Sequence, residues 1–199
     1  MAQSQLIHPV IVGLGGTPRP GSTSECALRI ALERARDAGA ETHMLSGRDL
    51  ILPAYDPSQP ERTVQASRLI DLLRKCDGVL IASPGYHGSV SGLLKNALDY
   101  IEDMRTDEQV YLDGRAVGCI VCAHGWQATG STLAALRSIV HALRGWPTPL
   151  GVAINSAQKI FDGEGRCVDA AVAQQLEMVA LQVVRFARMQ RAAASSAEA

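Results

Sequence analysis

Three glycine-bearing segments carry most of the residues that could bind a ligand. The first, Gly13–Ser24, reads GLGGTPRPGSTS, and its polar side chains are Thr17, Arg19, Ser22, Thr23 and Ser24. It departs from the dinucleotide-binding fingerprint at Pro18 and from the Walker A loop at Ser22, where lysine belongs. A loop with many hydrogen-bond donors and little charge is suited to binding a single terminal phosphate. The alternative is an ordinary strand-to-helix turn whose hydroxyls only cap the helix.

The other two segments combine glycine with a large aromatic residue. Ser83–Ser89 reads SPGYHGS, and Ala123–Gly130 reads AHGWQATG. Glycine lets the backbone approach a flat ligand closely, and Tyr86 and Trp126 offer aromatic faces. Taken alone, the second segment has a tight surface turn, with Tyr86 packed on the sheet edge, as its less favoured alternative. Together with the first, the two segments indicate a mononucleotide with a planar ring.

Short β-branched runs alternate with stretches of helical periodicity and must position these segments. Strands are expected at residues 10–12, 42–45, 79–82, 117–123 and 149–154. Ser22 and Glu25 form a possible capping box for the first helix, and the last helix is expected over about 168–189. This alternation predicts an α/β fold, a parallel sheet with helices on both faces. Ligands bind such sheets where the strands end, which is where the three segments lie.

Composition narrows the class of protein. The chain has 199 residues and a formal net charge of -1, which removes the electrostatic footprint of a nucleic-acid binder. No apolar run approaches the ~20 residues that span a bilayer, and the first residues lack the pattern of a secretory signal. Five cysteines, an odd number, favour reduced thiols and a cytoplasmic location. We expect one domain over residues 1–199, with a disordered tail from about residue 190.

The cysteines and histidines have structural interpretations. Cys119 and Cys122 have the spacing of a redox pair, but they lie inside an apolar strand and should point to opposite faces as core thiols. Cys167 is predicted to be the most exposed thiol. His87 and His124 have no carboxylate or thiolate partner at ligand spacing, so no metal site is expected.

The string SPGYHGSVSGLLKNALDY, Ser83–Tyr100, resembles the NADPH-dependent FMN reductase family of flavodoxin-like proteins. The likeness extends over roughly residues 7–185 and includes the first and third segments. It implies a three-layer flavodoxin-like sandwich with a five-stranded parallel sheet in the order 2-1-3-4-5. It also implies FMN as cofactor and NADPH or NADH as co-substrate.

The resemblance assigns site residues position by position. The FMN phosphate would be held by Thr17, Arg19, Ser22 and Ser24. The flavin ring would be lined by Pro84, Gly85, Tyr86, His87 and Gly88, and flanked on its other side by His124, Gly125 and Trp126. No catalytic side chain is implied, because the flavin carries the hydride chemistry. Many family members have glutamate at Gly85, asparagine at His87 and a smaller third loop, which leaves the electron acceptor open.

The resemblance implies an FMN-dependent NAD(P)H oxidoreductase. The acceptor would be a small molecule: free FMN for a partner monooxygenase, a quinone, an azo compound or a metal oxyanion. The alternatives are a flavodoxin-type electron carrier and a flavin-binding regulatory module; the near-neutral charge disfavours a carrier that docks electrostatically. Family members commonly pair through the helix of Leu93–Tyr100, which implies a homodimer or homotetramer. No nucleic acid or membrane is an expected partner.

Overall fold

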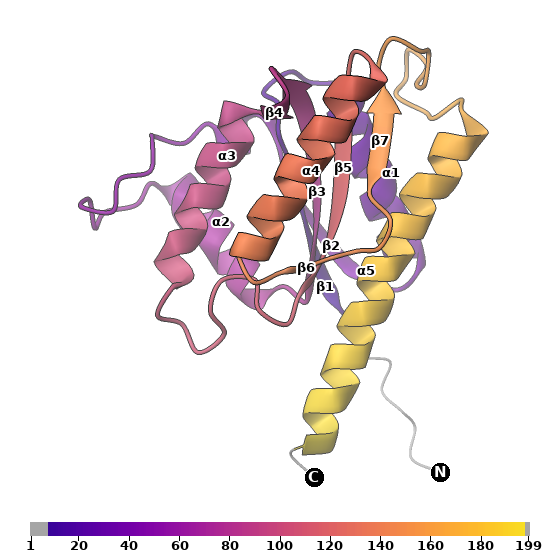
Figure 1. The fold of residues 1–199 in the computed structure, drawn as a ribbon. Coiled ribbons are helices and arrows are strands. Elements are labelled where there is room, and N and C mark those ends of the chain that lie inside the picture. Colours follow the sequence, from indigo (N-terminus) through magenta and orange to yellow (C-terminus); the bar gives the residue numbers. More distant parts are fainter. Residues whose placement is uncertain (1–7, 198–199) are drawn as a thin grey trace, which may run out of the picture.

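The computed structural model describes residues 8–197, so the expectation about the secretory signal lies partly outside the described residues. Its sheet is built around β1 (Val10–Gly15), β2 (Glu41–Leu45), β3 (Gly78–Tyr86), β5 (Ala116–Ala123) and β7 (Val152–Asn155) (Figure 1). These strands are parallel and lie side by side in the order β2-β1-β3-β5-β7. The order predicted for a flavodoxin-like sheet is therefore confirmed.

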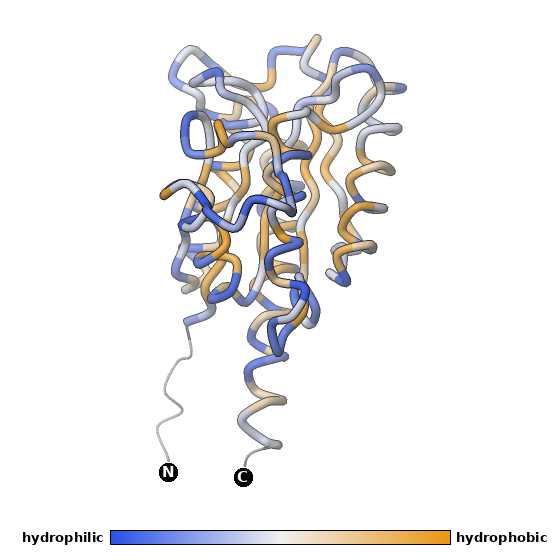
Figure 2. The backbone as a smooth tube through the Cα atoms, turned by 90° about the vertical axis from the view of Figure 1, so that its left-hand side faces the viewer, coloured by the Kyte–Doolittle hydropathy of each residue, from blue (hydrophilic) through white to orange (hydrophobic). Residues whose placement is uncertain are grey.

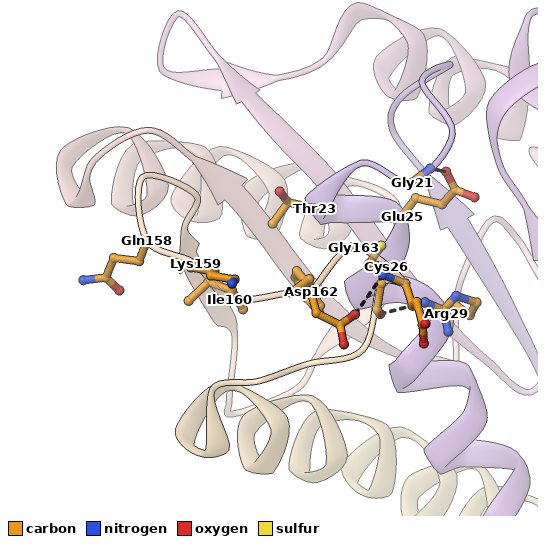
Figure 3. A pocket seen from close by; sticks show the side chains of 13 residues that line it. Gly21, Thr23, Glu25, Cys26, Arg29, Gln158, Lys159, Ile160, Asp162 and Gly163 are labelled. Atoms are coloured by element: carbon orange, nitrogen blue, oxygen red, sulfur yellow. Dashed lines mark hydrogen bonds between the residues drawn. The ribbon is translucent and has the colours of Figure 1, made fainter.

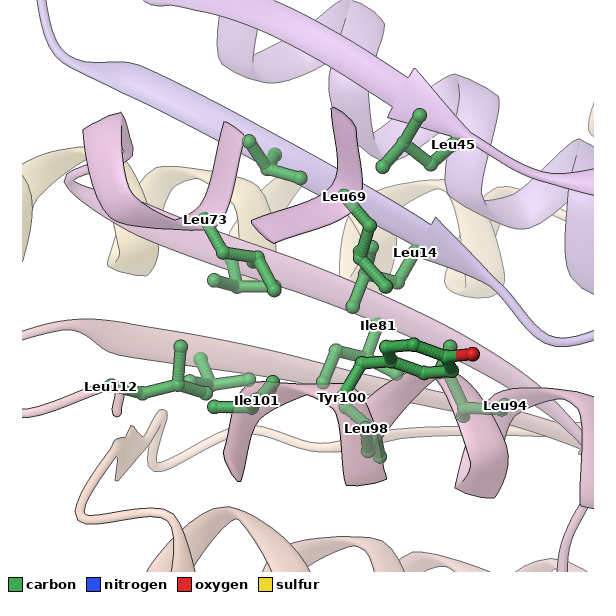
Figure 4. Close-up of a cluster of buried hydrophobic side chains, with 14 of the residues drawn as sticks. Leu14, Leu45, Leu69, Leu73, Ile81, Leu94, Leu98, Tyr100, Ile101 and Leu112 are labelled. Atoms are coloured by element: carbon green, nitrogen blue, oxygen red, sulfur yellow. The ribbon is translucent and has the colours of Figure 1, made fainter. Parts of the chain in front are cut away.

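Five helices cover the two faces of this sheet (Figure 1). They are α1 (Thr23–Asp37), α2 (Val64–Lys75), α3 (Gly92–Asp99), α4 (Trp126–Ala142) and α5 (Ala170–Ala197). One apolar cluster joins the sheet to α2, α3 and α4, with Leu69, Ile81 and Leu94 in it (Figure 4). A second cluster joins the opposite face to α1 and α5. The hydrophobic residues accordingly gather between the layers, as the hydropathy colouring of Figure 2 shows.

The first helix begins as the sequence predicts, with one difference in its cap. Ser22 Oγ accepts a hydrogen bond from the backbone N–H of Glu25 at 3.3 Å. The Glu25 carboxylate does not accept the hydrogen bond from the Ser22 N–H that a capping box requires. It accepts one from the N–H of Gly21 instead, at 2.9 Å. The glutamate thereby stabilises the preceding turn, where Gly21 has a φ of +66°. The helix ends before Gly39, as expected.

Two strand predictions change in detail. The strand expected over 149–154 is divided into β6 (Trp146–Pro147) and β7, and Pro149 lies between them rather than at a strand start. β6 and β7 pair with the two ends of β5, and the proline-rich stretch leaves the sheet between them. The third strand is longer than predicted and turns back into β4 (Ser89–Val90). His87 and Gly88 form that turn with φ values of 52° and 81°.

The tail predicted to be disordered is helical as far as it is described. α5 continues to Ala197, and the hydroxyls of Ser195 and Ser196 donate to the carbonyls of Arg191 and Ala192. Alanine has the highest helix propensity, so a small-residue tail continues a helix that is already nucleated. Residues 198–199 of the predicted tail lie outside the described residues. Within residues 8–197 no helix has the length and apolar character needed to cross a membrane.

Candidate functional site

A cavity of about 560 Å³ lies at the carboxyl ends of β1, β3 and β5. All three glycine-bearing segments contribute to it. The predicted site residues that line it are Thr17, Arg19, Ser22, Ser24, Pro84, Gly85, Tyr86 and His124. Pro18, Thr23, Cys122, Ala123 and Ser156 also line it. Segments about a hundred residues apart in the chain therefore meet at one cavity.

The first segment forms a polar cradle at the N-terminus of α1. Thr17, Ser22 and Ser24 are buried there, with the Ser22 and Ser24 hydroxyl oxygens 3.5 Å apart. The Thr17 hydroxyl accepts from the N–H of Arg19 at 3.2 Å, and the Arg19 side chain is exposed. The first N–H groups of a helix have no acceptor within the helix, and the helix dipole adds partial positive charge. The cradle therefore suits an anion.

Ser91 joins the first segment to the second through hydrogen bonds. Its hydroxyl donates to the carbonyl of Gly16 at 2.6 Å, while its N–H donates to Ser83 Oγ at 3.1 Å. A Cβ on Gly16 would lie 3.0 Å from Pro84 Cδ and from Ser91 Oγ, so only glycine allows this approach without displacement. Sequence reasoning did not identify Ser91, which also caps α3 by accepting from Leu94 N–H. Its position before a helical run was the available signal.

The second segment contributes Pro84, Gly85 and Tyr86 to the cavity. A Cβ on Gly85 would lie 2.6 Å from Thr132 Oγ1 and 2.9 Å from Ala123 Cβ. A side chain at this position would therefore displace its neighbours, which is consistent with glycine where many family members have glutamate. Tyr86 is 56% exposed at the cavity. His87 and Gly88 are not among the lining residues, because they form the turn beyond Tyr86.

The end of β7 positions the third segment. Asn155 Oδ1 accepts from the N–H groups of Gly125 and Ala157 at 3.0 and 3.1 Å. Ser156 Oγ and His124 Nδ1 are 3.1 Å apart, and both residues line the cavity. Sequence reasoning identified neither Asn155 nor Ser156.

Two predicted residues of the third segment are not among the residues that line the cavity. Gly125, with a φ of +95°, is the N-cap of α4, and Trp126 begins that helix with 60% of its surface exposed. Neither residue forms the wall of the cavity as predicted.

Replacement of Asn155 tests whether the third segment is held from β7. Asn155→Ala removes the acceptor of two backbone N–H groups, and we expect the affinity for FMN, the cofactor that the sequence resemblance implies, to fall by about tenfold. Asn155→Asp keeps the accepting oxygen and serves as the matched control, with a much smaller loss. Quenching of flavin fluorescence on titration measures both. Equal losses in the two variants would contradict this role of the amide oxygen.

The cysteines occupy the positions expected of core thiols. Cys119 packs in the cluster under α2, α3 and α4, whereas Cys122 packs in the cluster under α1 and α5, so the two point to opposite faces. Burial raises the pKa of the Cys119 thiol to about 12 and raises the pKa of Cys122 as well. Cys167 is the one partly exposed thiol of the five, all of which lie within the described residues. Cys122 also borders the cavity.

The described residues contain no group of three or more histidine, cysteine, aspartate or glutamate side chains that could hold a metal ion. The polar groups of the cavity are instead hydroxyls, backbone amides and imidazole. Such a donor set suits an organic ligand with an anionic end.

Comparisons with known proteins identify the family of this chain. The sequence model described as NADPH-dependent FMN reductase matches residues 9–159. An NAD(P)H-dependent FMN reductase of Pseudomonas aeruginosa is 28% identical over 190 residues, covering 88% of this chain and 96% of that protein. An FMN-dependent NADPH-azoreductase of Staphylococcus aureus is 27% identical over 158 residues, covering 77% and 80%.

Solved structures support the fold. FerB, a flavoenzyme NAD(P)H:(acceptor) oxidoreductase from Paracoccus denitrificans, matches with a TM-score of 0.68 and 22% identity over 92% of this chain and 98% of that one. RosB, solved with a bound flavin phosphate intermediate, matches with a TM-score of 0.73 and 17% identity, covering 96% and 86%. With a flavodoxin-like fold and a family match over residues 9–159, the chain belongs to the NADPH-dependent FMN reductase family.

Proposed function

We propose that the cavity at the strand ends binds FMN and that the protein transfers hydride from NADPH or NADH to a small acceptor. The observation that carries this proposal is the buried hydroxyl cradle of Thr17, Ser22 and Ser24 at the start of α1. A phosphate there would accept from these hydroxyls and from the first N–H groups of the helix. The ring would then extend toward the backbone of Pro84–Tyr86 and toward His124.

When bound, FMN supplies the hydride chemistry, accepting a hydride from a nicotinamide and passing it on. The protein chain contributes by holding the segments around the flavin in fixed positions. The hydrogen bonds of Ser91 and Asn155 fix the segments against one another, so the backbone around Gly85 and Gly125 is preorganised. Tyr86, exposed at the cavity, provides an aromatic surface against which a planar acceptor could stack.

Small acceptors fit an open cavity bordered by one exposed aromatic ring. Relatives named for azo compounds and for (hydroxy)cinnamate support an aromatic acceptor. The proposal includes three further acceptors: a quinone, a metal oxyanion, and free FMN that a partner monooxygenase would use. We also propose that the protein acts in the cytoplasm. We also propose a homodimer or homotetramer that pairs through α3. Sedimentation at several protein concentrations tests the assembly.

The decisive experiment compares FMN with riboflavin, which lacks the phosphate. Apoprotein should bind FMN at least about a hundredfold more tightly, because two or more charge-assisted hydrogen bonds are lost with the phosphate. The flavin-loaded protein should then oxidise NADPH or NADH in the presence of a quinone or azo dye. Apoprotein that binds neither flavin would refute the proposal. Binding of FMN without nicotinamide oxidation would leave a flavin-binding protein that is no reductase.

Replacement of Arg19 tests how much its positive charge contributes to FMN binding at the cradle. Because its side chain is exposed, water screens its attraction for the phosphate. We expect Arg19→Ala to weaken FMN binding by roughly three- to tenfold and to leave turnover at saturating FMN unchanged. Binding titrations at low and high salt measure this, and the difference between variant and wild type should shrink as salt rises. A loss of turnover with FMN fully bound would assign Arg19 to the chemistry instead.

A further inference from the structure

An apolar groove of about 380 Å³ lies between β6 and α5, which we call the α5 groove. Trp146, Pro147 and Pro149 line one side of it, and Arg185, Phe186 and Met189 of α5 line the other. The groove also reaches the first residue of β5, so it lies at the opposite end of that strand from the cavity described above. Its volume and its apolar, aromatic lining are those of small-molecule sites.

A cavity of about 500 Å³ beside the start of α1 has a different character (Figure 3). Its lining is mostly polar or charged. Arg29 on α1 donates to the carbonyl of Gly165 at 2.8 Å, and Asp162 and Glu164 each pair with Arg166, at 2.8 and 3.1 Å. These contacts hold the loop of residues 158–165 in shape and against the helix. An apolar ligand surface is found in the α5 groove instead.

Two aromatic rings and a methionine form the apolar surface of the α5 groove. The ring centroids of Trp146 and Phe186 are 5.8 Å apart. Trp146 and Met189 are 58% and 66% exposed, so much of this surface faces solvent. Large apolar side chains exposed together usually mark a binding site. The surface matches a flat apolar group that stacks on the Trp146 ring.

The polar side chains of the α5 groove offer donors rather than acceptors. The Gln182 side-chain oxygen accepts from the N–H of Leu150 at 3.1 Å, which leaves the NH₂ group of this amide to donate to a ligand. The Thr148 hydroxyl is buried and donates to the Leu150 carbonyl at 2.8 Å. Within residues 8–197, Arg185 forms no ion pair and no acidic residue lines the groove. A ligand therefore has to supply the acceptor, and negative charge on that acceptor is favourable.

Other occupants match this chemistry less well. A peptide strand that extends the sheet needs backbone N–H groups at this edge, and Pro147 and Pro149 have none. A second copy packed across a two-fold axis would bring the two copies of Arg185 together, with no carboxylate in the lining to offset their repulsion. A phosphate has more oxygens than one guanidinium and one amide can serve, whereas a carboxylate has two.

We propose that the α5 groove binds a small aromatic carboxylate. The aromatic ring of the ligand lies on Trp146, and its carboxylate accepts from the Arg185 guanidinium and the Gln182 NH₂ group. These two donors are three residues apart on α5 and therefore lie on the same side of the helix. Because the groove and the proposed FMN cavity lie at opposite ends of β5, the inference does not depend on flavin binding.

The test is calorimetric titration of the full chain with 3-phenylpropionate and with its neutral counterpart, 3-phenylpropionamide. We expect the carboxylate to bind about fivefold more tightly or better, a preference that water moderates because Arg185 is exposed. Arg185→Gln should remove this preference and change the affinity for the amide less than about twofold. Arg188→Gln, the same change at an exposed position of α5 outside the groove, is the matched control and should keep the preference.

Tryptophan fluorescence locates the ligand. Trp126→Phe leaves Trp146 as the single tryptophan of a chain that has two, and its emission should shift to shorter wavelength as 3-phenylpropionate covers the ring. Equal affinity for the carboxylate and the amide, no binding of either at about 10 mM, or binding that leaves this emission unchanged would overturn the inference. Self-association in sedimentation that Trp146→Ser abolishes would give the groove to a second copy of the chain and overturn it as well.

Discussion

Replacing Thr23 with glutamate is expected to weaken FMN binding by at least about thirtyfold while riboflavin binding stays unchanged. Thr23 is the first residue of α1 and lines the cavity at the strand ends, where we propose that FMN binds. Two unit charges 4 Å apart interact by about 4 kcal/mol at an effective dielectric constant of 20. Because Thr23 is only half-buried, we expect about half of that repulsion, or ~2 kcal/mol, which corresponds to roughly thirtyfold.

The fold should tolerate this substitution. Glutamate is favourable in the first turn of a helix, where it complements the dipole, so thermal unfolding should shift little. Thr23→Gln matches the size without the charge, and we expect it to bind FMN within about threefold of wild type. Titration of apoprotein by flavin fluorescence measures both ligands in both variants. If the glutamate and glutamine variants lost equal affinity, or if riboflavin binding fell in parallel, the phosphate would not lie on this helix turn.

The hydroxyl cradle at the start of α1 was predictable because all its parts are local in sequence. A β-branched run that ends in glycine, followed by hydroxyls and a helical pattern, specifies a strand, a turn and a capped helix within about fifteen residues. The parallel topology then places every such turn at the same edge. The same reasoning placed Pro84, Gly85 and His124 at this edge, and all three line the cavity there, at the carboxyl ends of β3 and β5.

Contacts between distant segments were not predictable. Ser156 enters the cavity because β7 pairs with the far end of β5, a register that no local pattern encodes. Asn155 is the last residue of β7, and its role depends on contacts with Gly125, thirty residues earlier in the chain. Conversely, His87 was predicted at the site, but the hairpin into β4 carries it past the cavity. The hairpin depends on His87 adopting a positive φ, which sequence alone gave little reason to expect.

Charge burial is the other property that sequence patterns failed to reveal. Arg115 is only 2% exposed, although arginine is rarely buried so completely. Its guanidinium donates to the carbonyls of Arg74 and Cys76 at the end of α2, at 3.1 and 2.9 Å, and to that of Tyr111 at 3.0 Å. The Gln109 side-chain oxygen accepts a further bond at 2.9 Å. The last carbonyls of a helix lack partners within the helix, so the cation completes the end of α2.

Replacing Arg115 with methionine should therefore lower the free energy of unfolding by about 3–5 kcal/mol, because it leaves several buried acceptors without a donor. Arg115→Lys retains the charge with fewer donors and should cost less. Arg185→Met, the same change at an exposed position of α5, should stay within about 0.5 kcal/mol of wild type. Urea denaturation measures all three. Because Arg115 precedes β5 and the proposed FMN cavity lies at the other end of that strand, the folded fraction should still bind FMN with wild-type affinity. Equal stability of the Arg115 and Arg185 variants would contradict the structural role of the buried guanidinium.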